Sequence, residues 1–219
     1  MLKNHTLLLF IVIISFVTGG CQMANGIGKD LKPSEMSEKD LPDVRALQDE
    51  FTRNFIQSIE EKEKGYYPFL SGTKRYRLLF PMEGLIHQGY AVKDNQSEGF
   101  LMSVINDNGT DSQIKINYHA DWSKESVKGA LKILEGRLEQ KLDFEKVTSE
   151  SSEVYYAPFK FEPDIFGVAA LVLSLNGEGA VQIMYDTQCQ DVKSKCQTIK
   201  EAEVEKMIHW VRSIKFVDK

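Results

Sequence analysis

The stretch SEVYYAPFKFEPDIFGVAALVLSLNGEGAVQIMYDT (residues 152–187) decides the fold class of this 219-residue chain. It contains three runs rich in β-branched and aromatic residues, 152–161, 167–176 and 180–187. Such runs, bounded by turn-forming residues, predict β-strands. Because the turn sequence Asn-Gly-Glu-Gly separates the last two runs, we expect them to pair as an antiparallel hairpin.

Further strands are predicted upstream of this stretch. Residues 112–120 alternate apolar Ile114, Ile116 and Tyr118 with polar Lys115, Asn117 and His119. This two-residue period is typical of a strand with one buried and one exposed face. Three more apolar runs, at 74–81, 89–94 and 99–107, have the same character.

Three helices are predicted around these strands. Residues 43–65 carry an apolar stripe at three- and four-residue steps, and Ser123 opens a second amphipathic segment. Thr198 and Glu201 form a capping-box pair that opens a third. The residues of the three stripes are Val44, Leu47, Phe51, Phe55 and Ile59; Val127, Ala130, Leu131, Leu134 and Leu138; and Val204, Met207, Ile208 and Val211. The order of elements predicts a single α+β domain over residues 43–219, with a largely antiparallel sheet covered by helices.

Several segments together resemble the PsbP-like fold. They are YRLLFPMEG, SKESVKGALKILEGRLEQ, VTSESSEVYYAPFKF and MIHWVRSIKF, all within residues 66–217. The fold is shared by photosystem extrinsic subunits, a Ran-binding transport factor and many bacterial lipoproteins. The resemblance implies a sandwich-like α+β domain that docks onto other proteins and has no active site of its own.

The N-terminus has the order of an export signal. Lys3 precedes an apolar run, residues 7–17, which is too short to span a membrane. The next residues, Val17-Thr18-Gly19-Gly20-Cys21, resemble the bacterial lipobox, although Thr18 stands where Leu or Ala is commoner. The resemblance implies that residues 1–20 are removed and that the thiol of Cys21 carries a diacylglyceryl group. The alternatives are an ordinary secretory signal followed by a coincidental cysteine, or a buried amphipathic start of the folded chain.

Composition and charge describe what remains after such cleavage. Residues 21–42 are polar, lack periodicity and are expected to form a flexible tether behind the lipidated cysteine. The net charge is −5, and it becomes −6 once Lys3 is removed. Since an acidic surface repels nucleic acid and anionic lipid, we expect no nucleic-acid partner, and the membrane must be held through the lipid on Cys21.

Two cysteines remain beyond Cys21. Cys189 and Cys196 lie seven positions apart, which fits neither a C-x-x-C redox motif nor, without further ligands, a zinc site. Outside the cytoplasm such a pair is expected to form a disulfide. Free thiols are the alternative.

No catalytic motif is recognisable in the sequence, so we expect a protein that is not an enzyme and needs no cofactor or metal. His119 and Asp121 could share a strand face and hold a metal, but exposed polar residues are the simpler interpretation. The aromatic clusters at 66–69 and 155–161 line either the core or a peptide- or glycan-binding groove. The acidic runs at 60–64 and 201–206 are most simply solvated faces.

Two functions are compatible with these features. The first is an extracytoplasmic, lipid-anchored protein of the cell membrane whose domain is a non-catalytic interaction or accessory module for an envelope protein. The alternative is a lipoprotein that binds a small ligand or a glycan, with weak catalysis at most. A deep apolar pocket with convergent polar groups would favour the alternative.

The lipobox interpretation predicts the behaviour of one variant. Cys21→Ser should abolish incorporation of labelled fatty acid, because the hydroxyl does not replace the thiol in the acylation, and should leave an uncleaved precursor or a shed soluble form. Metabolic labelling followed by membrane fractionation measures both. Unchanged acylation of the variant would contradict the interpretation.

Overall fold

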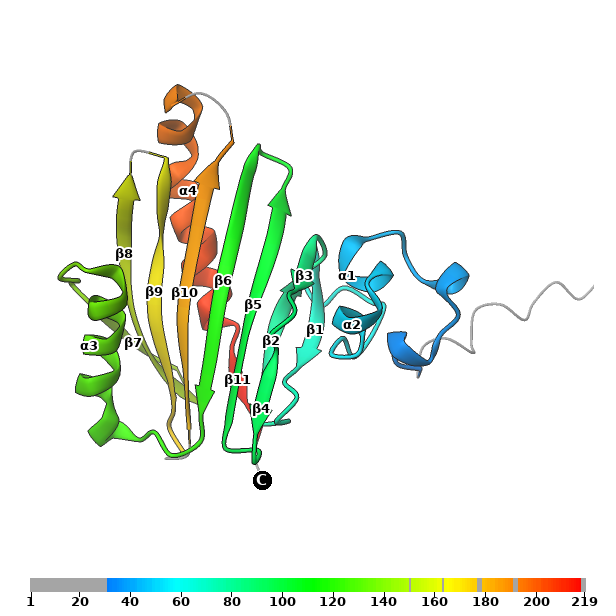
Figure 1. Ribbon diagram of the computed structural model, residues 1–219, viewed down its shortest axis with the longest axis horizontal. Coiled ribbons are helices and arrows are strands. Elements are labelled where there is room, and N and C mark those ends of the chain that lie inside the picture. Colours follow the sequence, from blue (N-terminus) through cyan, green and yellow to red (C-terminus); the bar gives the residue numbers. More distant parts are fainter. Residues whose placement is uncertain (1–30, 150, 163, 177–178, 191–192, 218–219) are drawn as a thin grey trace, which may run out of the picture.

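The computed structural model (Figure 1) describes residues 31–217 apart from residues 150, 163, 177–178 and 191–192 and the side chains of 193–197. Its helices are α1 (Arg45–Gln48), α2 (Glu50–Arg53), α3 (Val127–Leu138) and α4 (Lys193–Arg212), with short 3₁₀ turns at Pro33–Glu35, Glu38–Asp40 and Lys124–Ser126. Its strands are β1 (Tyr66–Leu70), β2 (Tyr76–Pro81), β3 (Gly84–Ile86), β4 (Ala91–Lys93), β5 (Ser97–Asn106), β6 (Thr110–His119), β7 (Glu145–Thr148), β8 (Ser152–Glu162), β9 (Ile165–Ser174), β10 (Ala180–Cys189) and β11 (Lys215–Phe216).

The strands form two antiparallel sheets. The large sheet has the order β3-β5-β6-β10-β9-β8-β7, with β4 paired to β5, and the small sheet has the order β1-β2-β11. The stretch 152–187 supplies β8, β9 and β10, and β9 pairs antiparallel to β10 as the hairpin prediction requires. The α+β class with a large antiparallel sheet is therefore confirmed.

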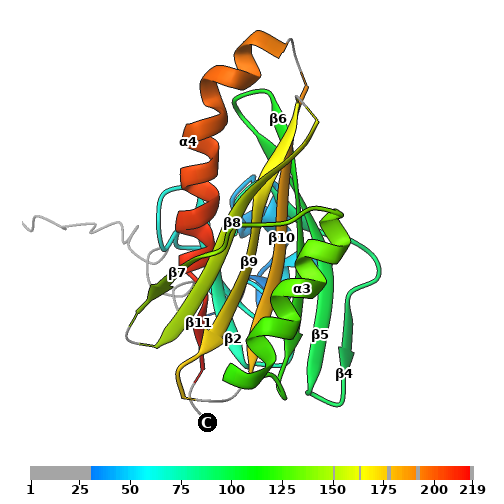
Figure 2. The ribbon, with the colours of Figure 1, turned by 90° about the vertical axis from the view of Figure 1, so that its left-hand side faces the viewer.

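The strand β9 is buried on both faces. Its side chains alternate between a cluster on α3, which includes Ala169 and Leu171, and a cluster on α4, which includes Val168 and Ala170. Figure 2 shows α3 and α4 on opposite sides of the sheet. On the α4 side, Trp210 is buried and its Nε1 donates to the carbonyl oxygen of Leu79 at 2.6 Å, which joins the small sheet to the large one.

Helices cover the large sheet only in part. The helix α3 packs over one half of a face of the large sheet, the half formed by β8, β9 and β10. The apolar stripe predicted for α3 is confirmed by the burial of Ala130, Leu134 and Leu138. On β5 and β6, Ile105, Gln113 and Lys115 are exposed. The expectation of a sheet covered by helices is therefore too strong.

The long helix expected over residues 43–65 is wrong. Asp49 adopts an extended backbone (φ −80°, ψ 117°) and caps α2 by accepting a 2.7 Å hydrogen bond from the amide of Thr52. After α2 the chain runs beside β1, where Ile56 forms a β-bridge with Phe69. Asp49 thus ends α1 and caps the start of α2. The apolar stripe has the period of a helix, but the chain does not form one continuous helix there.

Other boundaries also differ from the expectation. The helix α4 begins at Lys193, before the expected capping-box residue Thr198. Within the expected tether, Pro33 and Leu41 are buried, and Nη2 of Arg53 lies 3.4 Å from Oε1 of Glu38. The packed part of the chain therefore begins before residue 42.

The lipobox and Cys21 lie outside the described residues. Within the described residues, no helix combines the length and the apolar character needed to cross a membrane. Cys189 ends β10 and Cys196 belongs to α4, but the side chain of Cys196 is outside the described part. The disulfide between Cys189 and Cys196 therefore stays a prediction.

The close approach of β8, β9 and β10 predicts a strong effect at Gly167. A Cβ added there would overlap the carbonyl oxygen of Tyr185 and lie 2.6 Å from the ring of Phe159. Because the oxygen belongs to the backbone of a central strand, Gly167→Ala should destabilise the fold by about 3 kcal/mol, the upper end for overpacking. Denaturant unfolding measures the change.

Gly129 provides the matched control. It lies on α3, and a Cβ there would meet nothing within 4 Å. Gly129→Ala should therefore stabilise the protein by up to roughly 1 kcal/mol through helix propensity. Equal effects of the two substitutions would contradict the packing described for β9.

Candidate interaction site

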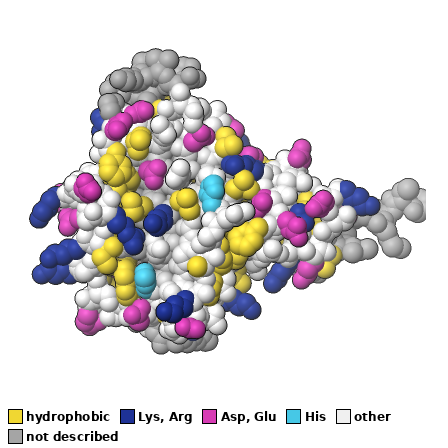
Figure 3. Space-filling view, in the orientation of Figure 1, with side chains coloured by type: hydrophobic (Ala, Val, Ile, Leu, Met, Phe, Trp, Pro, Cys, Tyr) yellow, Lys and Arg dark blue, Asp and Glu magenta, His cyan; other side chains and the backbone are white. Residues whose placement is uncertain are grey.

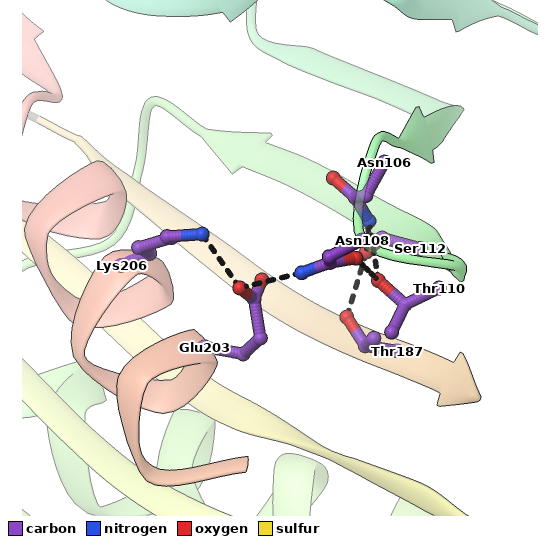
Figure 4. Close-up of polar contacts among 7 residues, drawn as sticks. All are labelled: Asn106, Asn108, Thr110, Ser112, Thr187, Glu203 and Lys206. Carbon is purple, nitrogen blue, oxygen red and sulfur yellow. Dashed lines mark hydrogen bonds and ion pairs between the residues drawn. The ribbon is translucent and has the colours of Figure 1, made fainter. Parts of the chain in front are cut away.

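A polar cluster joins α4 to the large sheet (Figure 4). We call it the α4 cluster; its members, which come from the β5–β6 hairpin, β10 and α4, are Asn106, Asn108, Thr110, Ser112, Thr187, Glu203 and Lys206. Thr110, Ser112 and Thr187 are buried, and Glu203 is only 6% exposed. The cluster is therefore a largely internal polar network that reaches the surface at Asn108 and Lys206.

The hairpin between β5 and β6 builds one side of this cluster. Gly109 takes a positive φ of 79°, which allows the tight turn after Asn108. Nδ2 of Asn106 donates to Thr110 Oγ1 at 3.0 Å and to Ser112 Oγ at 2.9 Å. Ser112 in turn lies 2.6 Å from the hydroxyl of Thr187 on β10. These bonds fix the turn against the neighbouring strand.

Asn108 and Glu203 connect the turn to α4. Nδ2 of Asn108 donates to Oε1 of Glu203 at 2.8 Å, while its Oδ1 accepts from the hydroxyl of Thr110 at 2.8 Å. The same Glu203 oxygen accepts from Nζ of Lys206 at 2.6 Å. The side chain of Lys206 is 63% exposed and that of Glu203 is 8% exposed. A buried carboxylate therefore holds a solvent-facing ammonium in place.

The same face of α4 continues to His209. Nε2 of His209 lies 2.9 Å from Oε2 of Glu63, and both side chains are largely exposed. Tyr66 lies between the two ion pairs: burial is the main cause that raises its pKa, Lys206 lowers it, and Glu203 and Glu63 raise it. We call Glu63, Tyr66, Lys206 and His209 the α4 surface. The two acidic runs predicted as separate solvated faces thus meet here.

The α4 surface has the chemistry of a recognition site. It offers the exposed ammonium of Lys206, which Glu203 of α4 holds, and the exposed imidazole of His209, which Glu63 holds from the segment just before β1. Fixed charges at a protein surface steer association and select partners with complementary charge. The α4 surface is therefore a candidate interaction site.

A second carboxylate, Glu98, is buried and fully paired. It accepts from the amides of Gly72 and Thr73 at 3.1 and 3.0 Å, from the Thr73 hydroxyl at 2.7 Å and from the Tyr90 hydroxyl at 2.7 Å. Burial, followed by the bond to Glu98, raises the pKa of Tyr90 well above its usual range. Glu98 therefore clamps the β1–β2 turn onto β5. Nothing in the sequence around Glu98 indicated this role.

The described histidines, His87, His119 and His209, belong to different parts of the fold. His87 is exposed just after β3, and the ring of His119 stacks on Trp122 with centroids 4.0 Å apart. Burial lowers the pKa of His119, against the opposing effect of Asp121. Among the described residues, no group of three His, Cys, Asp or Glu side chains is placed to hold a metal ion.

The aromatic clusters are largely core. In the first, Tyr67 and Phe69 are buried in β1; in the second, Tyr156 and Phe159 are buried in β8. Phe161, in contrast, is 50% exposed. The core interpretation is confirmed for most of both clusters.

Asp186 is a half-buried carboxyl on β10, beside Gly167 of β9 and Gln113 of β6 in the sheet register. Burial raises its pKa to about 6, and a hydrogen bond to its own backbone opposes the shift. A carboxyl that titrates near neutrality on a partly open sheet face is a candidate for ligand binding.

These features define an α+β protein built on a large antiparallel sheet, with exposed polar side chains held in place along α4. The profile of the family described as "Putative lipoprotein YvcA" (YvcA_Mog1p) matches residues 42–215, and the chain belongs to this family. The relative of that name from Bacillus subtilis (strain 168) is 32% identical over 166 residues, which cover 68% of this chain. The match spans 66% of the relative, slightly less than two thirds of its length.

Two solved structures resemble the fold more distantly. The Ran-binding protein Mog1p of Saccharomyces cerevisiae has a TM-score of 0.45 at 11% identity, covering 70% of this chain and 96% of Mog1p. A mutant of Mog1 gives the same TM-score and identity, with 97% of that chain covered. The wider PsbP-like resemblance stays a prediction.

The raised pKa of Asp186 predicts a pH effect on stability. The folded protein binds this proton more tightly than the unfolded chain does. The free energy of unfolding should therefore increase as pH falls from about 6, the pKa of Asp186 in the folded protein, towards 3.8, its unperturbed pKa. At pH 7.5, Asp186→Asn should stabilise the fold by roughly 1–2 kcal/mol, since partial exposure screens the effect.

Denaturant unfolding at pH 7.5 and pH 4 tests this prediction. The advantage of Asp186→Asn over the unchanged protein should shrink at the lower pH, where the carboxyl of Asp186 is largely protonated in the folded state. An advantage that is equal at both pH values would show that charge burial at Asp186 is not its cause.

Proposed function

We propose that this protein is a lipoprotein anchored in the cell membrane through a diacylglyceryl group on Cys21, with its folded domain on the extracytoplasmic face. The family description and the lipobox-like order of residues 17–21 support this proposal. The domain serves as a non-catalytic module that binds another protein of the cell envelope.

The observation that carries the binding role is the pair of ordered, exposed nitrogen groups on the α4 surface, the ammonium of Lys206 and the imidazole of His209. Lys206 is held by buried Glu203, and His209 is held by Glu63. Because these side chains are already ordered, a partner with complementary acidic groups would lose less conformational entropy on binding them. A lipid anchor would raise the local concentration of such a partner in the same membrane.

The chemistry of these groups favours recognition over catalysis. The carboxylate of Glu203 is bonded to Lys206, and that of Glu63 is bonded to His209. Among the contacts of the described residues, His209 has a carboxylate and not a hydroxyl or thiol nucleophile as its hydrogen-bond partner. A small-ligand or glycan-binding role is the second candidate. Asp186, half-buried with a raised pKa on the partly open sheet face, is the observation that favours it.

Removing the Lys206 ammonium and the His209 imidazole tests the binding role. In the double variant Lys206→Gln and His209→Gln, partner recovery from detergent-solubilised membranes should fall about three- to tenfold, because two exposed polar contacts, each worth about 0.2–1 kcal/mol, are lost. Glutamine is chosen at position 206 because a glutamate would repel Glu203. Quantitative mass spectrometry of the co-purified proteins, normalised to the lipoprotein, gives the measurement.

The exposed residues Lys128 and Lys132 of α3 supply the control, since they place two exposed basic side chains on the other side of the sheet. Their double change to Gln should leave partner recovery unchanged. If both double variants lose the partner equally, net charge and not the α4 surface governs binding. Unchanged recovery with the α4 variant would remove this surface from the proposal.

A further inference from the structure

An exposed aromatic patch lies where α2 meets the start of β4. We define it as Phe51, Phe55, Tyr90 and Val92. The centroid of the Phe55 ring lies 5.5 Å from that of Phe51 and 4.7 Å from that of Tyr90. Phe51 is 44% exposed and Val92 is 39% exposed. Figure 3 shows hydrophobic side chains gathered on this face, between the long strands and the N-terminal helical segment.

The patch is rigid because it continues into the core. Phe55 stacks on buried Phe69 with centroids 5.7 Å apart, and the ring of Tyr90 lies 5.5 Å from that of buried Phe100. The Tyr90 hydroxyl donates inward to Glu98. The polar end of Tyr90 is therefore used inside the protein, and the part of the patch that faces outward is apolar.

The patch lies at the end of the domain where the N-terminal segment leaves it. The turn Pro33–Glu35 packs against α2, and Glu38 pairs with Arg53 of the same helix. Leu31, the first described residue, is 41% exposed. Ten peptide steps separate it from Cys21, which span at most roughly 36 Å. A compact chain of this size has a radius of gyration of about 16 Å, so a lipid on Cys21 keeps this end of the domain near the bilayer.

We propose that the aromatic patch rests on the membrane surface, at the boundary between headgroups and acyl chains, and sets the orientation of the anchored domain. This inference depends on the proposed lipid anchor. In amphipathic helices that lie on a membrane, Phe and other apolar side chains enter that boundary. Four residues are far fewer than the roughly 20–30 that each side of a stable protein interface contributes, but even weak contacts are effective when an anchor makes them intramolecular.

Tryptophan fluorescence in vesicles of brominated phosphatidylcholine tests the contact. Phe51→Trp places a reporter in the patch, and Ile133→Trp places one on α3, which lies at the opposite end of the domain (Figure 1) and is 43% exposed at Ile133. The mature chain from residue 21 is coupled through the thiol of Cys21 to a maleimide phospholipid, with mass spectrometry confirming one lipid per chain. Emission from Trp122 and Trp210, measured with the unchanged sequence, is subtracted.

The two reporters should differ clearly. A ring at the acyl–headgroup boundary lies about 5–10 Å deep, so bromine should reduce the Phe51→Trp emission by about half and leave the Ile133→Trp emission nearly unchanged. Val92→Trp repeats the measurement from the neighbouring strand and should behave like Phe51→Trp. Thermal unfolding confirms that each variant is folded.

Equal quenching at the two ends, or none at position 51 and position 92, would overturn the proposal. If acrylamide also fails to quench the Phe51→Trp emission until residues 21–30 are removed, then that segment covers the patch. A concentration-dependent loss of acrylamide quenching would instead indicate a second copy of the chain. Since the maleimide lipid supplies the anchor chemically, this experiment is independent of fatty-acid labelling at Cys21, and the two proposals can fail separately.

Discussion

The burial of β9 on both faces is the constraint on which the other features depend. A strand with apolar side chains on both faces needs cover from two sides, and here α3 and α4 provide it. Gln182 on the neighbouring strand β10 makes the α3 side specific, because its Nε2 donates to the carbonyl oxygen of Ala130 and its Oε1 accepts from Arg137. Small residues, Gly167, Ala169 and Ala170, keep the neighbouring chains close.

The position of α4 follows from this constraint and determines the charged surface. Trp210 holds the C-terminal part of the helix against β2, and Glu203 holds its middle against the β5–β6 turn. A helix fixed at two points cannot slide along the sheet, so the outward-facing Lys206 and His209 keep a constant separation. The aromatic patch is separate from this arrangement, because it depends on β1, β4 and the Glu98 clamp.

An element can be predicted from sequence when the residues that determine it are neighbours in the chain. The β9–β10 hairpin and the α3 stripe depend on neighbours in the chain, and both were predicted correctly. The 43–65 helix failed because Asp49 ended the helical stretch through its own side chain, a local effect that the apolar period conceals. The strands β1, β3, β7 and β11 were missed because each has five residues or fewer, too few for a clear alternating pattern. In addition, β11 exists only through its pairing with β2, which is distant in sequence.

The candidate site shows the same division. The acidic runs containing Glu63 and Glu203 were noticed, but each was interpreted as a solvated face. Their meeting through Tyr66 depends on contacts between residues more than a hundred positions apart, such as the 146-residue separation of His209 from Glu63. No single stretch of sequence carries that information. Glu98 was invisible for a related reason, since its donors come from the β1–β2 turn and from Tyr90.

The pairing of β2 with the last strand has a consequence for how the chain acquires its structure. Leu79 receives a hydrogen bond from Trp210 across 131 residues, and β2 is flanked by β1 and by β11 at the C-terminal end of the described chain. During synthesis from the N-terminus, the edge of β2 that pairs with β11 therefore stays unpaired until residue 216 has been made. Contacts between such distant positions form slowly, and an open strand edge invites pairing with other chains. The completion of the small sheet is thus later than the formation of the β1–β2 hairpin, and in the interval the nascent chain carries an exposed strand edge that can aggregate.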